Sequence, residues 1–171
     1  MKKIAAVTNT IILNQTEIVY KIRRMAFQIY ETNASEEQIV IAGITANGFI
    51  LAQRLQEWVE KISPIKVLLC EVTINKQEPR EAISTSLSVS EYQNKSVVLV
   101  DDVLHSGTTL IYGVRHFLAA PLKQFKTAVL VDRNHKKYPI KADFKGISLS
   151  TSLNENIKVY LDGKNDRAIL E

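Results

Sequence analysis

Two adjacent carboxylates, Asp101 and Asp102, stand directly after an apolar run at residues 97–100, and a polar segment follows them at 105–109. A short apolar run of this kind is typical of a fully buried strand. Ionised carboxylates only accept hydrogen bonds, so they can hold neighbouring sugar hydroxyls, or a divalent metal directly or through its waters. The pair is therefore a candidate site for a diol, a metal, or both.

The polar segment consists of His105, Ser106, Gly107, Thr108 and Thr109, and it opens a predicted helix. A glycine lets the backbone approach a ligand closely, and the free N–H groups of a first helical turn attract phosphate. Either half of the motif can also be an ordinary strand end or helix cap. Their contiguity in a strand–loop–helix context predicts a site for ribose 5-phosphate.

The elements that must position this motif alternate along the chain. The predicted helices and strands occupy residues 15–31 (helix), 38–44 (strand), 48–62 (helix), 65–74 (strand), 96–100 (strand), 108–119 (helix) and 126–131 (strand), with short apolar segments at 4–7 and 11–13 and two or three short strands between 145 and 170. Residues 75–94 are polar and weakly patterned, which predicts a flexible flap with some strand. This order favours an α/β fold with a mostly parallel sheet and helices on both faces. Ligands of such sheets bind outside the carboxyl ends of the strands, where the acidic pair is expected.

Composition narrows the class of protein. The 171 residues are 46% hydrophobic with a net charge of +4, so a disordered chain is excluded and a single domain, 1–171, is expected. No apolar stretch is long enough for a membrane helix, and the single cysteine agrees with a reducing compartment. We expect a cytoplasmic protein without a membrane partner.

Residues 97–109 resemble the phosphoribosyl-pyrophosphate (PRPP) signature of type I phosphoribosyltransferases. Residues 128–146 resemble the segment that follows this signature in the pyrimidine-operon attenuation regulators that also act as uracil phosphoribosyltransferases. Residues 23–31 resemble the first helix of that family. The resemblance covers nearly the whole chain and is strongest over 96–160. It implies the type I phosphoribosyltransferase fold, with a flexible flap and a small hood, and a homodimer or larger assembly.

The resemblance implies transfer of ribose 5-phosphate from PRPP to a nucleobase, most simply uracil, with release of pyrophosphate and with Mg²⁺ as cofactor. Asp101 and Asp102 would be the catalytic pair, holding the ribose hydroxyls and stabilising positive charge at the anomeric carbon. They would also bind the metal, directly or indirectly. Residues 105–109 would bind the 5-phosphate, and Arg133 and His135 would lie near the base.

The loop expected to bind pyrophosphate departs from the family pattern. The family usually has Lys-Thr-Arg-Gly there, whereas this chain has Thr45, Ala46, Asn47 and Gly48. Losing one charge-assisted contact of this type costs on the order of 2–4 kcal/mol of transition-state stabilisation. The sequence therefore predicts binding of PRPP or a nucleotide but not fast turnover.

Two further departures concern cations. Thr108 stands where the phosphate loop of the family often has Arg, and the flap lacks the usual Arg-Asp-Asp. Lys76 or Arg80 can supply positive charge from the flap if it closes over the site. A non-catalytic PRPP or nucleotide sensor on the same fold stays open as an alternative.

A regulator that binds a messenger RNA leader is the other alternative. Lys21, Arg23 and Arg24 share one predicted helix, and the last two align with a Thr-Arg pair that contacts RNA in the regulators. Further basic residues could extend a phosphate-tracking surface: Lys123, Lys126, Lys136, Lys137 and Lys141. These basic residues are not interleaved with aromatic residues that stack unpaired bases, and a solvated helix face is the simpler interpretation.

Overall fold

A six-stranded sheet forms the centre of the computed structural model, which describes residues 9–152 and 154–171. The strand order is β4-β3-β2-β5-β6-β7, and all pairings are parallel except β4 with β3. The strands are β2 (Gln38–Ile44), β3 (Lys66–Thr73), β4 (Ser84–Thr85), β5 (Ser96–Leu104), β6 (Gln124–Arg133) and β7 (Phe144–Leu149). The predicted mostly parallel sheet is confirmed.

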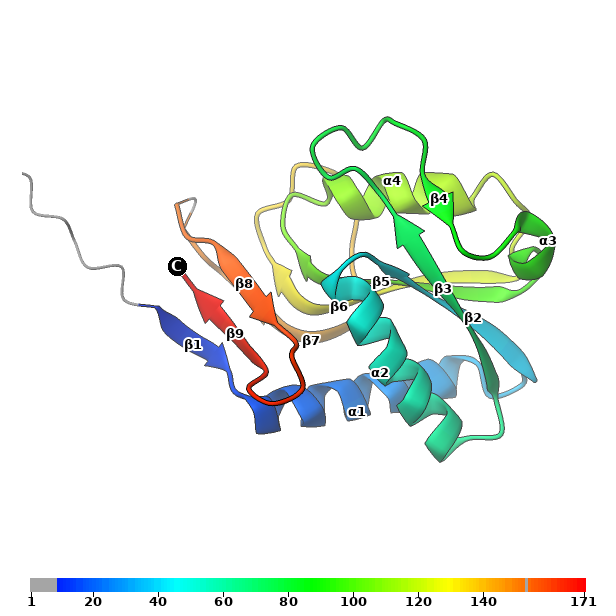
Figure 1. The fold of residues 1–171 in the computed structure, drawn as a ribbon, viewed down its shortest axis with the longest axis horizontal. Coiled ribbons are helices and arrows are strands. Elements are labelled where there is room, and N and C mark those ends of the chain that lie inside the picture. Colours follow the sequence, from blue (N-terminus) through cyan, green and yellow to red (C-terminus); the bar gives the residue numbers. More distant parts are fainter. Residues whose placement is uncertain (1–8, 153) are drawn as a thin grey trace, which may run out of the picture.

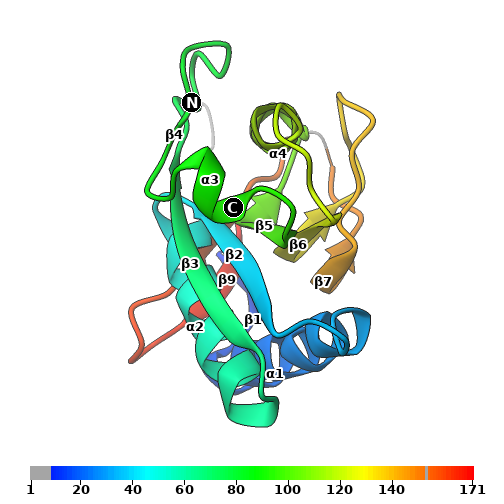
Figure 2. The ribbon, with the colours of Figure 1, turned by 90° about the vertical axis from the view of Figure 1, so that its right-hand side faces the viewer.

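Helices cover both faces of this sheet, as predicted (Figures 1 and 2). α1 (Gln15–Thr32) and α2 (Asn47–Ile62) pack on one face, where their apolar stripes join one hydrophobic core. α4 (Thr108–Phe117) packs on the other face in a second core. Both α2 and α4 begin at the carboxyl edge of the sheet, so their first turns point toward the predicted site.

The start of α1 shows why its sequence forms a helix at this place. The side chain of Asn14 accepts a hydrogen bond from the backbone N–H of Glu17, and the carboxylate of Glu17 accepts one from the N–H of Asn14. This reciprocal cap is the predicted capping box, and it satisfies two N–H groups at the helix start. Five residues of the helix are buried at helical spacing: Ile18, Ile22, Met25, Ala26 and Ile29.

A small second sheet forms the hood. It is antiparallel, with the order β1-β9-β8, and consists of β1 (Thr10–Leu13), β8 (Ile157–Tyr160) and β9 (Arg167–Leu170). The guanidinium of Arg54 on α2 forms an ion pair with Asp166, whose side chain is buried in the turn before β9. The hood is thereby attached to α2, beside the carboxyl edge of the large sheet (Figure 1).

The boundaries of β5 correct one prediction. The strand does not end at Val100 but continues to Leu104, so Asp101 and Asp102 lie within it. On one side β6 keeps pairing with β5 as far as Leu104, whereas β2 stops pairing at Val100. The acidic pair therefore lies on a half-paired extension of the strand, which leaves one side open to a ligand.

The flap contains more structure than its weak patterning indicates. Besides the expected strand β4, it contains a one-turn helix, α3 (Val89–Tyr92), capped by Ser88 and Glu91. A four-residue helix is too short to show helical periodicity, which is why this element was not predicted. The apolar segment at 4–7 lies outside the described residues. Within 9–152 and 154–171, no helix combines the length and hydrophobicity needed to cross a bilayer.

Candidate active site

A cavity of about 310 Å³ opens at the carboxyl edge of β5. Among the predicted site residues, those that line it come from the start of α2, the flap, β5, and the loop from β5 into α4: Asn47, Lys76, Asp101, Asp102, His105, Ser106, Gly107, Thr108 and Thr109. The structure thus brings the predicted diol site and the predicted phosphate site into one cavity. This is the expected location for a ligand of a parallel sheet.

The acidic pair is electrostatically strained in the absence of a cation. Asp101 is only 4% exposed, and burial, followed by the negative charge of Asp102, raises its pKa to about 8. The ammonium of Lys76 lies 3.8 Å from Asp101 Oδ1 and opposes this rise, but it does not outweigh burial. A bound cation, or hydrogen-bond donors from a ligand, would therefore stabilise the ionised form of both carboxylates.

The phosphate loop has the geometry that its sequence predicts. Gly107 is the N-cap of α4, with φ 84°, and an added Cβ would clash with Ile140 Cγ2. Only glycine suits this position, and it has no side chain that could cap the helix. The hydroxyls of Ser106 and Thr108 lie 2.8 Å apart beside the first turn. Free N–H groups and neighbouring hydroxyls therefore meet where a phosphate would bind.

His105 also lines the cavity, as a neutral side chain. Its pKa is lowered by burial and by the nearby charge of Arg133, while Asp102 acts in the opposite direction. A neutral imidazole can donate one hydrogen bond and accept another. His105 therefore adds polarity to the cavity without adding charge at neutral pH.

The segment 45–48, which leads from β2 into α2, contributes one side chain to the cavity. Asn47 Nδ2 donates to Asp102 Oδ2 at 2.9 Å and to the carbonyl of Val159 on β8 at 2.8 Å. Thr45 and Ala46, joined by a cis peptide bond, do not line the cavity. Gly48 lies directly behind the acidic pair, where an added Cβ would meet the carbonyl of Val100 at 2.8 Å.

We predict that Gly48→Ala lowers the free energy of unfolding by about 1–3 kcal/mol, because the new methyl group has no room between α2 and β5. Urea denaturation monitored by circular dichroism measures this change. Gln53→Ala, at an exposed position of the same helix, is the matched control and should be close to neutral. Equal stability of the two variants would contradict the packing described for Gly48.

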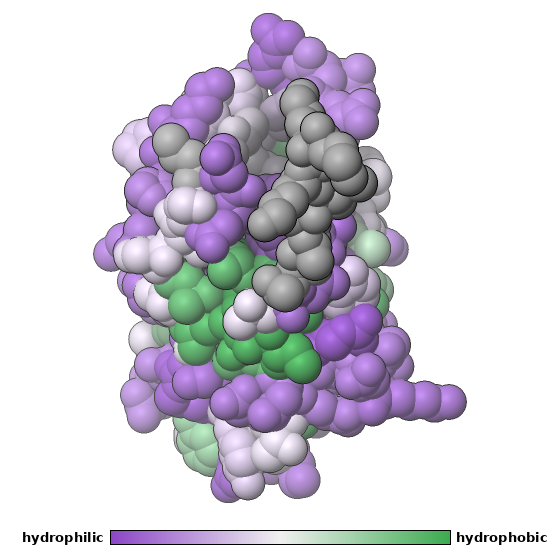
Figure 3. All heavy atoms as spheres, turned by 90° about the vertical axis from the view of Figure 1, so that its left-hand side faces the viewer, coloured by the Kyte–Doolittle hydropathy of each residue, from purple (hydrophilic) through white to green (hydrophobic). Residues whose placement is uncertain are grey.

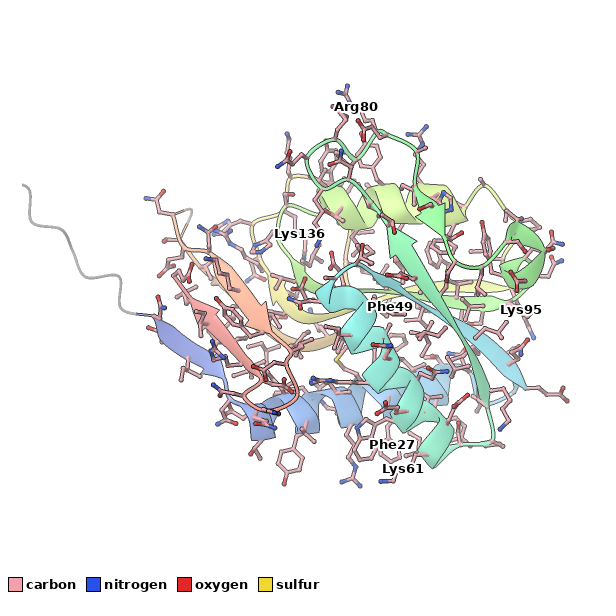
Figure 4. The ribbon with its side chains drawn as sticks, in the orientation of Figure 1. Phe27, Phe49, Lys61, Arg80, Lys95 and Lys136 are labelled. Atoms are coloured by element: carbon pink, nitrogen blue, oxygen red, sulfur yellow. The ribbon has the colours of Figure 1, made fainter. Side chains whose placement is uncertain are left out.

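Three further residues, predicted to contact the base or the pyrophosphate, also lie outside this cavity. Arg133 is buried and donates from Nε to Thr151 Oγ1 and from Nη2 to the carbonyl of Ser152. His135 is exposed. Arg80 pairs with Glu78 near the far end of the flap (Figure 4). Contact of Arg133 and His135 with a base, and of Arg80 with pyrophosphate, stays a prediction.

The basic residues of α1 have different surroundings. Arg24 donates to the carbonyls of Lys145 and Gly146, so it covers part of the open edge of β7. Arg23 lies over the ring of Phe27 at 5.9 Å and over the ring of Trp58 at 5.5 Å.

The prediction that no aromatic rings are interleaved with these basic residues is therefore wrong for Arg23. Lys61 also lies over Trp58, at 4.8 Å, and Figure 4 shows Phe27 and Lys61 on the same side of the molecule. Trp58 and Lys61 belong to α2, so the sequence of α1 alone could not show this cluster. Three of the outlying lysines are engaged in ion pairs: Lys123 with Glu36, Lys136 with Asp132 and Lys141 with Asp143.

Sequence reasoning missed the contribution of the hood to the cavity. The hood residues that line it are Ile157, Lys158, Val159 and Tyr160. Their alternating burial indicates a strand but not which surface the strand covers. Lys158 is also paired with Glu171 at 2.6 Å, close to the end of the chain. No local signal in the sequence could have placed these residues over the acidic pair.

Comparisons with known proteins identify the family of this chain. Residues 8–162 match the family model described as phosphoribosyl transferase domain. A protein of Macrococcus caseolyticus named bifunctional protein PyrR is 36% identical over 168 residues, covering 92% of this chain and 94% of the relative. A protein of the same name from Fusobacterium nucleatum is 35% identical over 172 residues, covering 94% and 97%.

Solved structures agree on the fold. The hypoxanthine phosphoribosyltransferase of Trypanosoma cruzi has a TM-score of 0.78 at 18% identity, covering 94% of this chain and 95% of that one. A hypoxanthine-guanine phosphoribosyltransferase of Bacillus anthracis has a TM-score of 0.71 at 18% identity, covering 86% of both chains. With the family match and the PyrR relatives, these findings show that the chain belongs to the phosphoribosyltransferase family and has the type I fold.

Proposed function

We propose that this protein transfers ribose 5-phosphate from PRPP to a nucleobase, with uracil as the first candidate, and releases pyrophosphate. One observation carries the proposal: the acidic pair and the uncapped start of α4 line the same cavity. A ribose 5-phosphate has a diol at one end and a dianionic phosphate at the other. The cavity offers acceptors for the first and N–H donors for the second.

Each part of the cavity has a proposed role in this reaction. Residues 105–109 bind the 5-phosphate, while Asp101 and Asp102 accept hydrogen bonds from the ribose hydroxyls and stabilise positive charge at the anomeric carbon. The pyrophosphate lies against the loop 45–48, whose contribution comes mainly from the backbone. Lys76, already 3.8 Å from Asp101, supplies one cation from the flap.

Mg²⁺ is the proposed cofactor, and the donor set fits it. Mg²⁺ prefers oxygen ligands and is usually bound through one or two carboxylates together with substrate phosphates and waters. Among the described residues no group of three or more acidic, histidine or cysteine side chains gathers, so the protein offers only the acidic pair. Asp101 and Asp102 would hold the ion, directly or through waters, and it would offset the charge of the leaving pyrophosphate.

The acceptor base is proposed to lie against the hood. Val129 and Ile157 provide apolar surface in the cavity, and β8 runs along its wall. Uracil is favoured by the resemblance of residues 128–146 to the uracil-using regulators. Neither Arg133 nor His135 lines the cavity. We therefore propose that they lie near the base and hold the chain segment around it, without contacting the base directly.

The test is a screen of nucleobases. The protein is incubated with PRPP, Mg²⁺ and each base in turn, and released pyrophosphate is measured by a coupled assay. We expect release with uracil and none without a base. Silence with every base would contradict the proposed transfer. Calorimetry with PRPP and UMP would then identify a nucleotide sensor if binding occurs without turnover.

RNA binding is a second candidate function, favoured by the cluster of Arg23, Phe27, Trp58 and Lys61. Unpaired bases stack both on aromatic rings and on the planes of guanidinium groups, and this cluster offers the two side by side. The partner would be the leader of the messenger RNA that encodes the protein. The surface is small and would neutralise few phosphates, so we expect weak binding with a shallow salt dependence.

We predict that Arg23→Ala weakens retardation of this leader RNA by about tenfold, because it removes both a phosphate contact and a stacking plane. Arg24→Ala should weaken it less and should instead lower stability, since Arg24 is engaged by the carbonyls at the edge of β7. Electrophoretic mobility shift and thermal unfolding separate the two effects. No retardation by the unaltered protein would remove this function.

A homo-oligomer and a cytoplasmic location complete the proposal. The face that carries the hood has an apolar patch (Figure 3), and Ile11 on β1 is 62% exposed. Exposed apolar patches of this kind commonly mark protein interfaces. Sedimentation equilibrium should give a mass of at least two chains, and a monomer at micromolar concentration would contradict this assembly.

A further inference from the structure

One amide group joins three parts of the molecule that lie far apart in the sequence. Asn47, the first residue of α2, donates one hydrogen bond to the Asp102 carboxylate and another to the Val159 carbonyl. The first partner belongs to the large sheet and the second to the hood. Both protons of the Asn47 amide are therefore used, and the amide is oriented from two sides.

α2 contacts the hood a second time through Arg54. This residue is two helical turns after Asn47, so both lie on the same face of the helix. The ion pair of Arg54 with Asp166 holds the turn between β8 and β9, and neither residue lines the cavity. The hood is thus attached to α2 by Arg54 as well as by Asn47, so the contacts of Asn47 are not needed for attachment alone.

We propose that Asn47 is a positioning residue for the transfer reaction, which sets the orientation of the Asp102 carboxylate and couples it to the placement of β8 over the cavity. Donation to Oδ2 fixes the plane of the carboxylate, while Oδ1 accepts from the backbone N–H of Val103. Both oxygens keep a lone pair for ribose hydroxyls or a metal-bound water. The hood strand that covers the base is held by the same amide.

The inference rests on the proposed function, and it assigns Asn47 a role other than contact with pyrophosphate. A side chain whose two donors are committed to Asp102 and Val159 has none left for a leaving group. Pyrophosphate at the loop 45–48 then meets backbone groups, and a change at Asn47 should act on turnover more than on PRPP affinity. Partners of this kind typically change activity about 10- to 100-fold when they are removed.

The experiment compares Asn47→Ala, Asn47→Asp and Asn165→Ala. The aspartate has the same shape as asparagine but faces two acceptors without a proton to donate. Asn165 is an exposed hood residue whose side chain has no hydrogen bond within the described part of the chain, so it is the matched control. We expect kcat to fall about 10- to 100-fold in Asn47→Ala and further in Asn47→Asp, with KM for PRPP within threefold, and no change in the control.

Hydrogen exchange provides a second measurement that needs no turnover. Backbone amides of 157–160 should exchange faster in both Asn47 variants than in the control, while β2 and β3 stay unchanged. Wild-type kcat and hood exchange in Asn47→Asp, or a KM that rises while kcat stays constant, would overturn the inference. If the unaltered protein released no pyrophosphate with any base, the proposed function would fail, and the exchange measurement would still decide the coupling.

Discussion

Replacing both Asp101 and Asp102 by Asn is expected to weaken binding of PRPP and of UMP by at least about a thousandfold, which corresponds to about 4 kcal/mol. Each hydrogen bond from a ligand hydroxyl to an ionised group contributes about 1.5–3 kcal/mol, and the amides that replace the carboxylates form only neutral hydrogen bonds. The double variant also removes the only acidic pair in the cavity that could hold Mg²⁺. Isothermal titration calorimetry with each ligand measures the loss.

The matched control changes the other adjacent acidic pair, Glu36→Gln with Glu37→Gln. This pair lies just before β2, at the opposite edge of the sheet, and its loss changes the net charge by the same amount. We expect unchanged affinity in the control and a folded double variant in both cases, since Asn is close in size to Asp. Affinity for PRPP that survives in the Asp101 and Asp102 variant would refute the role of the pair.

Local sequence signals placed the central elements of the fold. The strand 38–44 was predicted with its observed bounds because its apolar run is closed by polar residues on both sides. The start of α1 was marked by a reciprocal cap that depends only on residues three apart. The end of β5 was misplaced because it depends on β6, a strand that pairs with it from more than twenty residues away. Pairing between distant strands has no local signature.

The distinction between local signals and contacts distant in the sequence also applies to the parts of the site. The phosphate loop and the acidic pair are contiguous, so their types and order sufficed to place them in one cavity. The bridge from Asn47 to Asp102 and Val159 joins segments separated by 55 and 112 positions, and the cluster around Arg23 joins two helices. Residue types at these positions are ordinary for exposed loops and helix faces. Their roles follow from packing and not from any motif.

The pKa of Asp101 has a consequence for stability. An acid whose folded pKa lies above its unfolded value stays protonated in the folded protein while the unfolded chain has already lost the proton. Burial, and then the negative charge of Asp102, raises the pKa of Asp101 from 3.8 to about 8. Its contribution to stability is therefore complete below pH 3.8, is lost progressively as pH rises toward 8, and changes no further above that pH.

We predict that the free energy of unfolding of the ligand-free protein falls between pH 6.5 and pH 8 by about 2 kcal/mol, since each pH unit in this range costs about 1.4 kcal/mol. Below pH 6.5 the lowered pKa values of His105 and His116 act in the opposite direction, because the unfolded chain then binds protons that the folded protein does not. Urea denaturation at pH 6.5, 7, 7.5 and 8 measures the slope, and Asp101→Asn should flatten it because the variant has no proton to lose at this position. Exposed carboxylates with lowered pKa values, such as Glu91 and Asp162, act only below about pH 4.5, outside this window. Saturating PRPP with Mg²⁺ should also flatten the slope, because a bound cation favours the charged pair. The same slope in the wild type and in Asp101→Asn would show that burial of this carboxylate does not control the stability of the free site.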